Sequence, residues 1–221
     1  MKRVVAIDGP SGAGKSTVAR GVADVLGSSV LDTGAMYRSA TLAVLHRGVD
    51  PEDAEACADV ARAADIDLRD GIRLDGRDVT TEIRGPAVTA AVSTVSAHPG
   101  VRAVLVARQR EWADAHGGGV IEGRDIGTVV FPDAAVKVFL TASDAERARR
   151  RQRDEVAAAR EVDVERVRED LDRRDRLDST RKTSPLQAAV DAWVVDTTEL
   201  AIPEVVAEIV ERYRAATGAQ T

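Results

Sequence analysis

Near its amino end the chain reads Gly9-Pro10-Ser11-Gly12-Ala13-Gly14-Lys15-Ser16-Thr17. This stretch fits the pattern G-x-x-x-x-G-K-[ST], in which glycines let the backbone curl so that several N–H groups point at one phosphate chain. The lysine of the pattern reaches the β- and γ-phosphates, and the hydroxyl that follows it joins the ligand shell of a Mg²⁺ ion. The alternative interpretation is a glycine-rich turn that binds nothing.

The sequence on either side of the loop favours the phosphate-binding interpretation. Residues 4–7 form an apolar run typical of a buried strand, and residues 17–26 follow a helical pattern. A strand, a loop and a helix in this order are the setting that the motif needs. The positive end of the helix dipole then adds to the backbone N–H groups. The loop alone therefore predicts a nucleoside triphosphate binder, with all of residues 9–17 near the phosphates.

Composition limits the classes of protein to consider. A chain of 221 residues, 44% of them hydrophobic, suits one α/β domain with a real core. The net charge of −6 argues against a general binder of nucleic acids or membrane surfaces. No stretch approaches the ~20 apolar residues of a membrane span. Cys57 stands alone, so we expect a reducing compartment, the cytoplasm.

Apolar runs alternate with helical patterns along the chain. The runs are residues 4–7, 30–31, 119–121, 136–140 and 193–195. The helical patterns cover residues 17–26, 36–47, 51–64, 101–115, 145–159, 164–176 and 203–215. Strands that alternate with helices predict a mostly parallel five-stranded sheet covered on both faces, a three-layer α/β/α fold of the P-loop NTPase class.

Two segments exceed what simple crossovers need. Residues 66–79 alternate in polarity around Asp-Gly turns, which predicts a small hairpin within an inserted acceptor lobe at about 37–96. Residues of about 147–162 are dense in charge and predict either a solvated helix face or a lid that brings arginines to a phosphoryl group. The core then comprises about 1–36, 97–146 and 163–221 of a single kinase unit spanning 1–221.

Two broad functions fit a phosphate loop: a phosphotransferase, and a nucleotide switch or motor that acts through partners. The chain contains no asparagine, so it lacks the Asn-Lys-x-Asp motif with which guanine-nucleotide switches read the base. The small size, the inserted lobe and the arginine-rich segment favour a kinase that encloses a small acceptor, because transfer to an acceptor requires the exclusion of water.

Four blocks, in order and spanning nearly the whole chain, carry a family resemblance. They are residues 8–17, residues 31–38 (Leu-Asp-Thr-Gly-Ala-Met-Tyr-Arg), residues 122–132 (Glu-Gly-Arg-Asp-Ile-Gly-Thr-Val-Val-Phe-Pro) and residues 174–181 (Arg-Asp-Arg-Leu-Asp-Ser-Thr-Arg). Together they resemble the bacterial cytidylate kinases. The resemblance implies transfer of the ATP γ-phosphoryl group to CMP or dCMP, a nucleoside-monophosphate kinase fold with an acceptor lobe and a lid, and a monomer.

The resemblance also implies the residues that hold the acceptor. The family's base readers correspond to Ser93, Arg102 and Asp125. Cytosine carries an exocyclic amine, so a carboxylate acceptor at Asp125 would disfavour uracil. Arg38 and Arg124 correspond to the arginines that hold the CMP phosphate, and Thr33 and Tyr37 belong to the same acceptor-side motif. Asp178 corresponds to the acceptor for a sugar hydroxyl, and Arg174 and Arg181 beside it reach the sugar or the phosphate. Singly, Ser93, Arg102 or Arg181 could instead be an ordinary helix-face or surface residue.

The expected mechanism needs no nucleophilic side chain, because the acceptor phosphate itself attacks. Lys15, Arg124 and lid arginines chosen from Arg147, Arg150, Arg151 and Arg153 neutralise charge. Ser16 is expected to hold Mg²⁺, with a water ordered by Asp8 or Glu122. Two alternatives stay open: a P-loop kinase for another nucleoside monophosphate or a shikimate-like alcohol, and an ATP-binding regulatory protein.

Overall fold

The computed structural model describes residues 2–69, 71–157 and 163–218, and their contacts divide the chain into two compact units. Unit 1 comprises residues 1–30, 116–180 and 184–221, and unit 2 comprises residues 31–115 and 181–183. The predicted lid falls in unit 1, with its residues 158–162 outside the described part of the chain. The predicted bounds of core, insertion and lid stay predictions.

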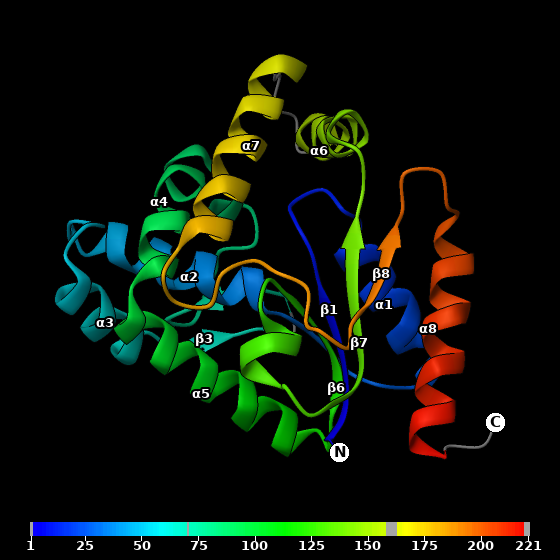
Figure 1. The fold of residues 1–221 in the computed structure, drawn as a ribbon. Coiled ribbons are helices and arrows are strands. Elements are labelled where there is room, and N and C mark those ends of the chain that lie inside the picture. Colours follow the sequence, from blue (N-terminus) through cyan, green and yellow to red (C-terminus); the bar gives the residue numbers. More distant parts are fainter. Residues whose placement is uncertain (1, 70, 158–162, 219–221) are drawn as a thin grey trace. The chain divides into compact units, whose positions relative to one another are not determined.

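The large sheet has the strand order β2-β6-β1-β7-β8 (Figure 1), and all of it except residues 31–32 of β2 belongs to unit 1. β1 pairs in parallel with β6 and β7, and β7 pairs in parallel with β8. Each strand contains one of the apolar runs, so the predicted mostly parallel sheet of an α/β fold is confirmed. The strands are β1 (Lys2–Asp8), β2 (Val30–Asp32), β6 (Gly119–Gly123), β7 (Ala134–Thr141) and β8 (Trp193–Asp196).

Helices α1 (Lys15–Leu26) and α8 (Ile202–Thr217) cover one face of this sheet. Ile7 of β1 and Val138 of β7 are buried in one cluster with Val18 of α1 and Ile209 of α8. β-Branched residues fit such a pleated, packed surface, which is why short Val-rich runs form strands here. Burying these side chains supplies the main free energy that holds α1, and with it the phosphate loop, in place.

The register of the parallel strands brings their carboxyl ends to one edge of the sheet. Asp8 of β1 lies beside Gly123 of β6 and Phe139 of β7, and Ile7 lies beside Glu122. In open α/β sheets ligands bind outside the carboxyl ends of the strands. The polar residues that end β1 and β6 therefore lie at the same edge as the phosphate loop.

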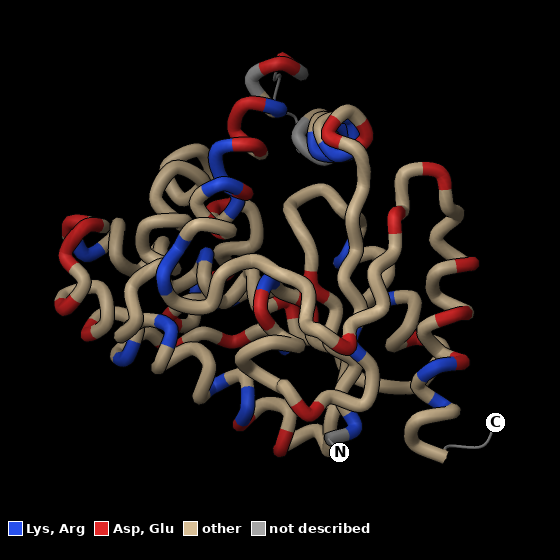
Figure 2. The backbone as a smooth tube through the Cα atoms, in the orientation of Figure 1, with Lys and Arg blue, Asp and Glu red and all other residues tan. Residues whose placement is uncertain are grey.

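Three more helical segments belong to unit 1: the π-helical turn η2 (Ile126–Val130), α6 (Asp144–Ala157) and α7 (Val164–Thr180). α6 and α7 pack on each other through Ala148, Val167 and Leu171. Both signs of charge are distributed along the two helices (Figure 2). The helical patterns at 145–159 and 164–176 agree with α6 and α7, except that residues 158–159 lie outside the described part.

Unit 2 is mostly helical, with contacts of α2 on α4 and of α3 on α5. Residues 66–79, predicted as a hairpin, form three short antiparallel strands in the order β3-β4-β5, because the chain reverses twice within the segment. Its elements are α2 (Thr33–His46), α3 (Ala54–Ala63), β3 (Ile66–Asp67), β4 (Arg73–Leu74), β5 (Arg77–Asp78), the 3₁₀ turn η1 (Glu82–Arg84), α4 (Pro86–Ala97) and α5 (Pro99–Ala115).

Among the described helices, no single one is long and apolar enough to cross a bilayer. Only α4 and α5 taken together, bent by 93° where they meet, reach the required length and composition.

Candidate active site

The phosphate loop joins β1 to α1 in a conformation that two glycines make possible. Gly9 has φ +145°, and a Cβ atom there would lie 2.1 Å from the carbonyl oxygen of Leu140. Gly12 has φ +80°, and a Cβ atom there would lie 2.9 Å from the backbone oxygen of Arg147. Any other residue at these positions would therefore push the loop away from β7 or from α6.

Lys15 is the first residue of α1 and is almost fully buried. Its Nζ donates a hydrogen bond of 2.7 Å to the carbonyl oxygen of Pro10. Its pKa is lowered to about 7, mainly by burial and then by the nearby positive charge of Arg124, while the charge of Glu122 opposes the shift. An ammonium group in this position gains strongly from an added anion, which is the property required of a phosphate-binding lysine.

Ser16 and Glu122 form the oxygen-rich corner of the loop. The Ser16 hydroxyl donates to Glu122 Oε2 at 2.9 Å, and Glu122 is buried at the end of β6. Hydroxyl and carboxylate oxygens suit Mg²⁺, which keeps several waters and takes its other ligands from phosphates. Among the described residues no group of three or more His, Cys, Asp or Glu side chains could hold a metal ion by itself. The corner thus fits a Mg²⁺ ion that arrives bound to ATP.

We expect Ser16→Ala to raise the Mg²⁺ concentration for half-maximal rate by about 10–100-fold, because the variant removes the hydroxyl ligand. Glu122→Gln keeps an acceptor for Ser16 but removes the charge, so it is expected to shift the same midpoint by a smaller factor. Mg²⁺ titration of initial rates measures both, and Ser29→Ala, an exposed serine, is the control. Identical Mg²⁺ midpoints in all variants would exclude the corner as the metal site.

Arg124, Arg174 and Asp178 form a charged cluster beside the loop. Arg124 Nε donates to Asp178 Oδ2 at 3.3 Å, and both side chains are mostly buried. Arg174 Nη1 lies 3.4 Å from the Ser11 hydroxyl, and burial followed by the charge of Arg124 lowers its pKa to about 10. Within the described part of the chain, Arg174 Nε is buried without a hydrogen-bond partner. Such an unsatisfied donor fits an anionic ligand.

Asp125 lies directly after β6 and before η2, and its side chain is buried. Its carbonyl oxygen accepts hydrogen bonds from the amides of Val129 and Val130. The backbone thus places Asp125 at the same edge of the sheet as Asp8. The negative charge of Asp125 contributes to the raised pKa of Asp8.

The candidate lid arginines differ in their surroundings. Arg147 is buried, and its guanidinium donates to Ser11 O at 3.1 Å, to Asp144 and to Asp175. Arg150 donates to Glu146 and to the Thr197 hydroxyl and carbonyl oxygens, and so lies near the start of α1. Arg151 is partly buried and Arg153 is exposed. The structure therefore brings Arg147 and Arg150 closest to the loop.

Asp175 is a residue that the sequence interpretation missed. Its carboxylate accepts from the Ser11 amide at 3.3 Å and from Arg147, so it links α6, α7 and the phosphate loop. The sequence contained a signal, because Arg174, Asp175 and Asp178 have a spacing that places them on one side of a helix. Asp175 is therefore a mostly buried link between these elements and not a solvated charge on a helix.

In unit 2, three predicted residues come together where α2, α4 and α5 meet. The Arg102 guanidinium lies 5.3 Å from the centre of the Tyr37 ring, a cation–π arrangement. Arg102 also donates to the carbonyl oxygen of Ser96, whose hydroxyl donates to the carbonyl oxygen of Ser93. Tyr37, Ser93 and Arg102 thus share one corner of the unit.

The other predicted residues of unit 2 lie around α2. Arg38 is buried and donates to the carbonyl oxygen of Ile83 and to the Thr89 hydroxyl. Thr33 is buried in the first turn of α2, and the side chain of Asp32 caps this helix at the Ala35 amide. Arg181 follows α7 in the chain and belongs to unit 2 by its contacts.

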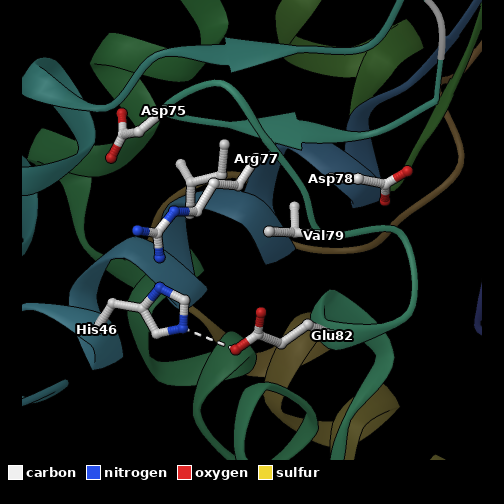
Figure 3. A pocket seen from close by; sticks show the side chains of 7 residues that line it. His46, Asp75, Arg77, Asp78, Val79 and Glu82 are labelled. Atoms are coloured by element: carbon white, nitrogen blue, oxygen red, sulfur yellow. Dashed lines mark hydrogen bonds and ion pairs between the residues drawn. The ribbon is translucent and has the colours of Figure 1, made fainter.

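Unit 2 also contains a pocket of about 370 Å³ beside the small sheet, where none of the predicted site residues lies (Figure 3). His46 Nε2 and Glu82 Oε1 are hydrogen-bonded at 2.7 Å across it. Asp75 and Asp78 accept hydrogen bonds from the amides of Asp65 and Thr80. These carboxylates stabilise turns within unit 2, and none of the described residues that line the pocket belongs to the phosphate loop.

A phosphate loop on a parallel sheet, a buried lysine and an arginine-rich helix pair define a P-loop phosphotransferase. A family model described as Cytidylate kinase matches residues 5–215. The cytidylate kinase of Mycolicibacterium paratuberculosis is 57% identical over 208 residues, which cover 92% of this chain and 91% of that protein. The cytidylate kinase of Geobacillus kaustophilus is 50% identical over 218 residues, which cover 96% and 97%. The chain therefore belongs to the cytidylate kinase family, and the resemblance seen in its sequence is confirmed.

Solved structures of low identity agree in fold alone. A gluconokinase from Sinorhizobium meliloti aligns with a TM-score of 0.50 at 15% identity, covering 97% of this chain and 94% of that one. An uncharacterized protein from Eubacterium ventriosum aligns with a TM-score of 0.56 at 11% identity, covering 96% and 98%.

Proposed function

We propose how this chain carries out the reaction of its family, the ATP-dependent phosphorylation of CMP and dCMP. A phosphate oxygen of CMP attacks the γ-phosphorus of ATP while the bond from that phosphorus to the β,γ-bridging oxygen breaks. The electron pair of the broken bond remains on ADP, and CDP carries the transferred group. Mg²⁺ neutralises phosphate charge when it is bound. No general base is needed, since the phosphate of CMP, with a second pKa of about 6, is largely ionised near neutral pH.

The observation that supports this mechanism best is the concentration of buried cations around the phosphate loop. Lys15, Arg147 and Arg174 are each less than a tenth exposed, and Arg124 lies beside them. The pKa values of Lys15 and Arg174 are lowered because burial and neighbouring cations disfavour their charged forms when no phosphate is bound. Phosphates remove that cost, and preorganised cations stabilise the charge of the transferred group without having to rearrange.

The acceptor roles are assigned residue by residue from the family resemblance. We assign base recognition to Asp125, Ser93 and Arg102, and phosphate binding to Arg38 and Arg124. The remaining assignments are Asp178 to the sugar hydroxyls, Thr33 and Tyr37 to the acceptor motif, and Arg174 and Arg181 to sugar or phosphate. Forked guanidinium donors hold a phosphate at a fixed angle, which in-line attack requires.

The proposal also covers the Mg²⁺ site, the oligomeric state of the protein and its location in the cell. We assign Ser16 to Mg²⁺, with Glu122 ordering a bound water, because the Glu122 carboxylate is the one that contacts the Ser16 hydroxyl, whereas Asp8 holds the amides of Ile126 and Gly127. We propose a monomer that acts in the cytoplasm, where a free, buried thiol such as Cys57 stays reduced.

Single alanine replacements of Arg147, Arg150, Arg151 and Arg153 are expected to separate catalysis from binding. We expect at least one variant to lose about a hundredfold in kcat with little change in KM for CMP, because its charge acts only on the transferred group. Arg147 and Arg150 should show larger effects than Arg153, since they contact the loop or its neighbours. Arg149→Ala, in which the lost side chain is 60% exposed, is the control on the same helix. Four silent variants would remove α6 from the mechanism.

The experiment that tests the function is a coupled assay of ADP release with CMP, dCMP, UMP, AMP and shikimate as acceptors. We expect release with CMP and dCMP to exceed release with the other three. Preference for AMP, UMP or shikimate would indicate a different P-loop kinase, and ATP binding without release for any acceptor would indicate a regulatory protein.

A further inference from the structure

The last residue of β1, Asp8, connects two distant parts of unit 1 through its side chain. Its Oδ1 accepts a hydrogen bond of 2.8 Å from the Ile126 amide, and its Oδ2 accepts one of 2.8 Å from the Gly127 amide. The side chain is nearly inaccessible, with a residue exposure of 4%. Both carboxylate oxygens are therefore engaged by the backbone of a segment more than a hundred residues away in sequence.

The segment held in this way is the turn that follows Arg124 and Asp125. Ile126 and Gly127 open the π-helical turn η2, in which the first amides have no earlier carbonyl of the same helix to bind. Asp8 supplies these missing acceptors. Gly127 is also confined from the other side, since a Cβ atom there would lie 3.2 Å from the Lys137 side chain. The direction of the chain at Asp125 thus depends on a carboxylate from another strand.

We propose that Asp8 is a positioning residue for acceptor recognition: by holding the start of η2 it aims Arg124 and Asp125 at the nucleotide that accepts the phosphoryl group. This inference rests on the roles proposed above for those two residues. It differs from a role in the phosphate loop, although Asp8 immediately precedes Gly9, and it differs from ordering a water on Mg²⁺, because each oxygen of Asp8 holds a backbone amide of η2.

The electrostatic setting makes the connection sensitive to pH. The pKa of Asp8 is raised to about 6. Burial is the main cause and the charge of Asp125 adds to it, while the two amides and the charge of Lys15 oppose the rise. Glu122 lies on β6 beside Ile7, and Lys137 of β7 is paired with Asp191. As the pH falls below about 6, Asp8 gains a proton and loses acceptor capacity toward one amide. Acceptor binding should then weaken.

Asp8→Asn tests the proposal with almost no change in volume, because it replaces one acceptor oxygen with a donor that faces a backbone amide. We expect kcat/KM for CMP to fall by about a hundredfold, since small displacements of positioning groups have effects of this size. The preference for CMP over UMP should fall as well, while KM for ATP changes by no more than about twofold. Asp133→Asn, an exposed carboxylate just beyond the other end of η2, should leave all three unchanged.

The pH profile provides a readout that loss of folding alone would not give. The phosphate of CMP also titrates at about pH 6, but it does so equally for both enzymes. The ratio of wild-type to Asp8→Asn kcat/KM for CMP should therefore shrink as the pH falls through about 6. A ratio that stays constant with pH would overturn the proposal, as would a variant that raises only KM for ATP.

A measurement on the wild-type protein covers the case in which Asp8→Asn does not fold. The amide proton resonances of Ile126 and Gly127 should shift together with a midpoint near pH 6 in the absence of any nucleotide, whereas resonances with no such midpoint contradict the connection. The wild-type rate with CMP, measured in parallel, distinguishes a failure of the proposed kinase function from a failure of the role proposed for Asp8. An enzyme inert toward CMP refutes the proposed function, and an active enzyme with unchanged Asp8→Asn kinetics refutes the role of Asp8 alone.

Discussion

Replacing Lys15 with alanine is expected to lower kcat by about a thousandfold while the protein still folds. The ammonium group lies at the start of α1, where it can neutralise charge on the β- and γ-phosphates as the γ-phosphoryl group moves. Because the folded-state pKa of about 7 lies below that of an exposed lysine, the buried charge opposes folding at neutral pH. Steady-state rates with saturating ATP and CMP measure the loss, and thermal unfolding of Lys15→Met should show no loss of stability.

The same lysine gives a signature in binding. At about pH 8 much of the Lys15 amine is neutral, and the negative charge of a triphosphate favours its ammonium form, so ATP binding should take up a proton. Calorimetry in buffers with different ionisation heats measures this uptake, and Lys15→Met should remove it. Near-normal turnover of Lys15→Ala, or wild-type binding with no net uptake, would contradict the role assigned to this residue.

The second large effect is expected at Asp125, in the choice of base. A buried carboxylate accepts a hydrogen from the exocyclic amine of cytosine, whereas uracil presents a carbonyl at the same position and leaves the charge unsatisfied. We expect Asp125→Ala to lower the ratio of kcat/KM for CMP to that for UMP by about a hundredfold or more. Asp125→Asn should reduce this ratio further, because the amide can donate to the uracil carbonyl.

Competition between CMP and UMP in one reaction measures the Asp125 ratio directly. Asp133→Asn is the matched control, since it removes an exposed carboxylate close to the same turn. A ratio that is unchanged in both Asp125 variants would take Asp125 out of base recognition and leave Ser93 and Arg102 as the candidates.

Much of the fold was predictable because local patterns and tertiary structure agree. Each strand of the large sheet contains an apolar run, and the motif of residues 9–17 already implied β1 and α1 on either side. The order β2-β6-β1-β7-β8 was not predictable, since it depends on how the strands pack rather than on any one run. The turn η2 was missed for a related reason. Thr128, Val129 and Val130 are typical of a strand, and contacts with Asp8 and Lys137 keep the segment in a π-helical turn.

The residues of the candidate site likewise fall into those that the sequence predicts and those that only the folded chain reveals. The phosphate loop, Lys15 and Ser16 follow from the motif alone, because the chemistry requires those residues at that spacing. The acceptor residues Arg38, Ser93 and Arg102 came only from the family resemblance, since an arginine or serine on a helix is usually an ordinary surface group. The contacts of Asp175, and those of Asp8 with η2, are visible only in the folded chain, although the sequence had already named Asp8 as a possible water-ordering carboxylate. Each is a carboxylate whose partner is a backbone amide distant in sequence, and no local pattern encodes such a partner.

Phosphorus NMR of the enzyme with MgATP and CMP follows the transferred group itself and distinguishes its transfer to CMP from hydrolysis. We expect the signals of ATP to decline while those of ADP and CDP rise in equal amounts, with inorganic phosphate staying at the level of a reaction without enzyme. Growth of inorganic phosphate in place of CDP, or no change with CMP and dCMP, would contradict this expectation.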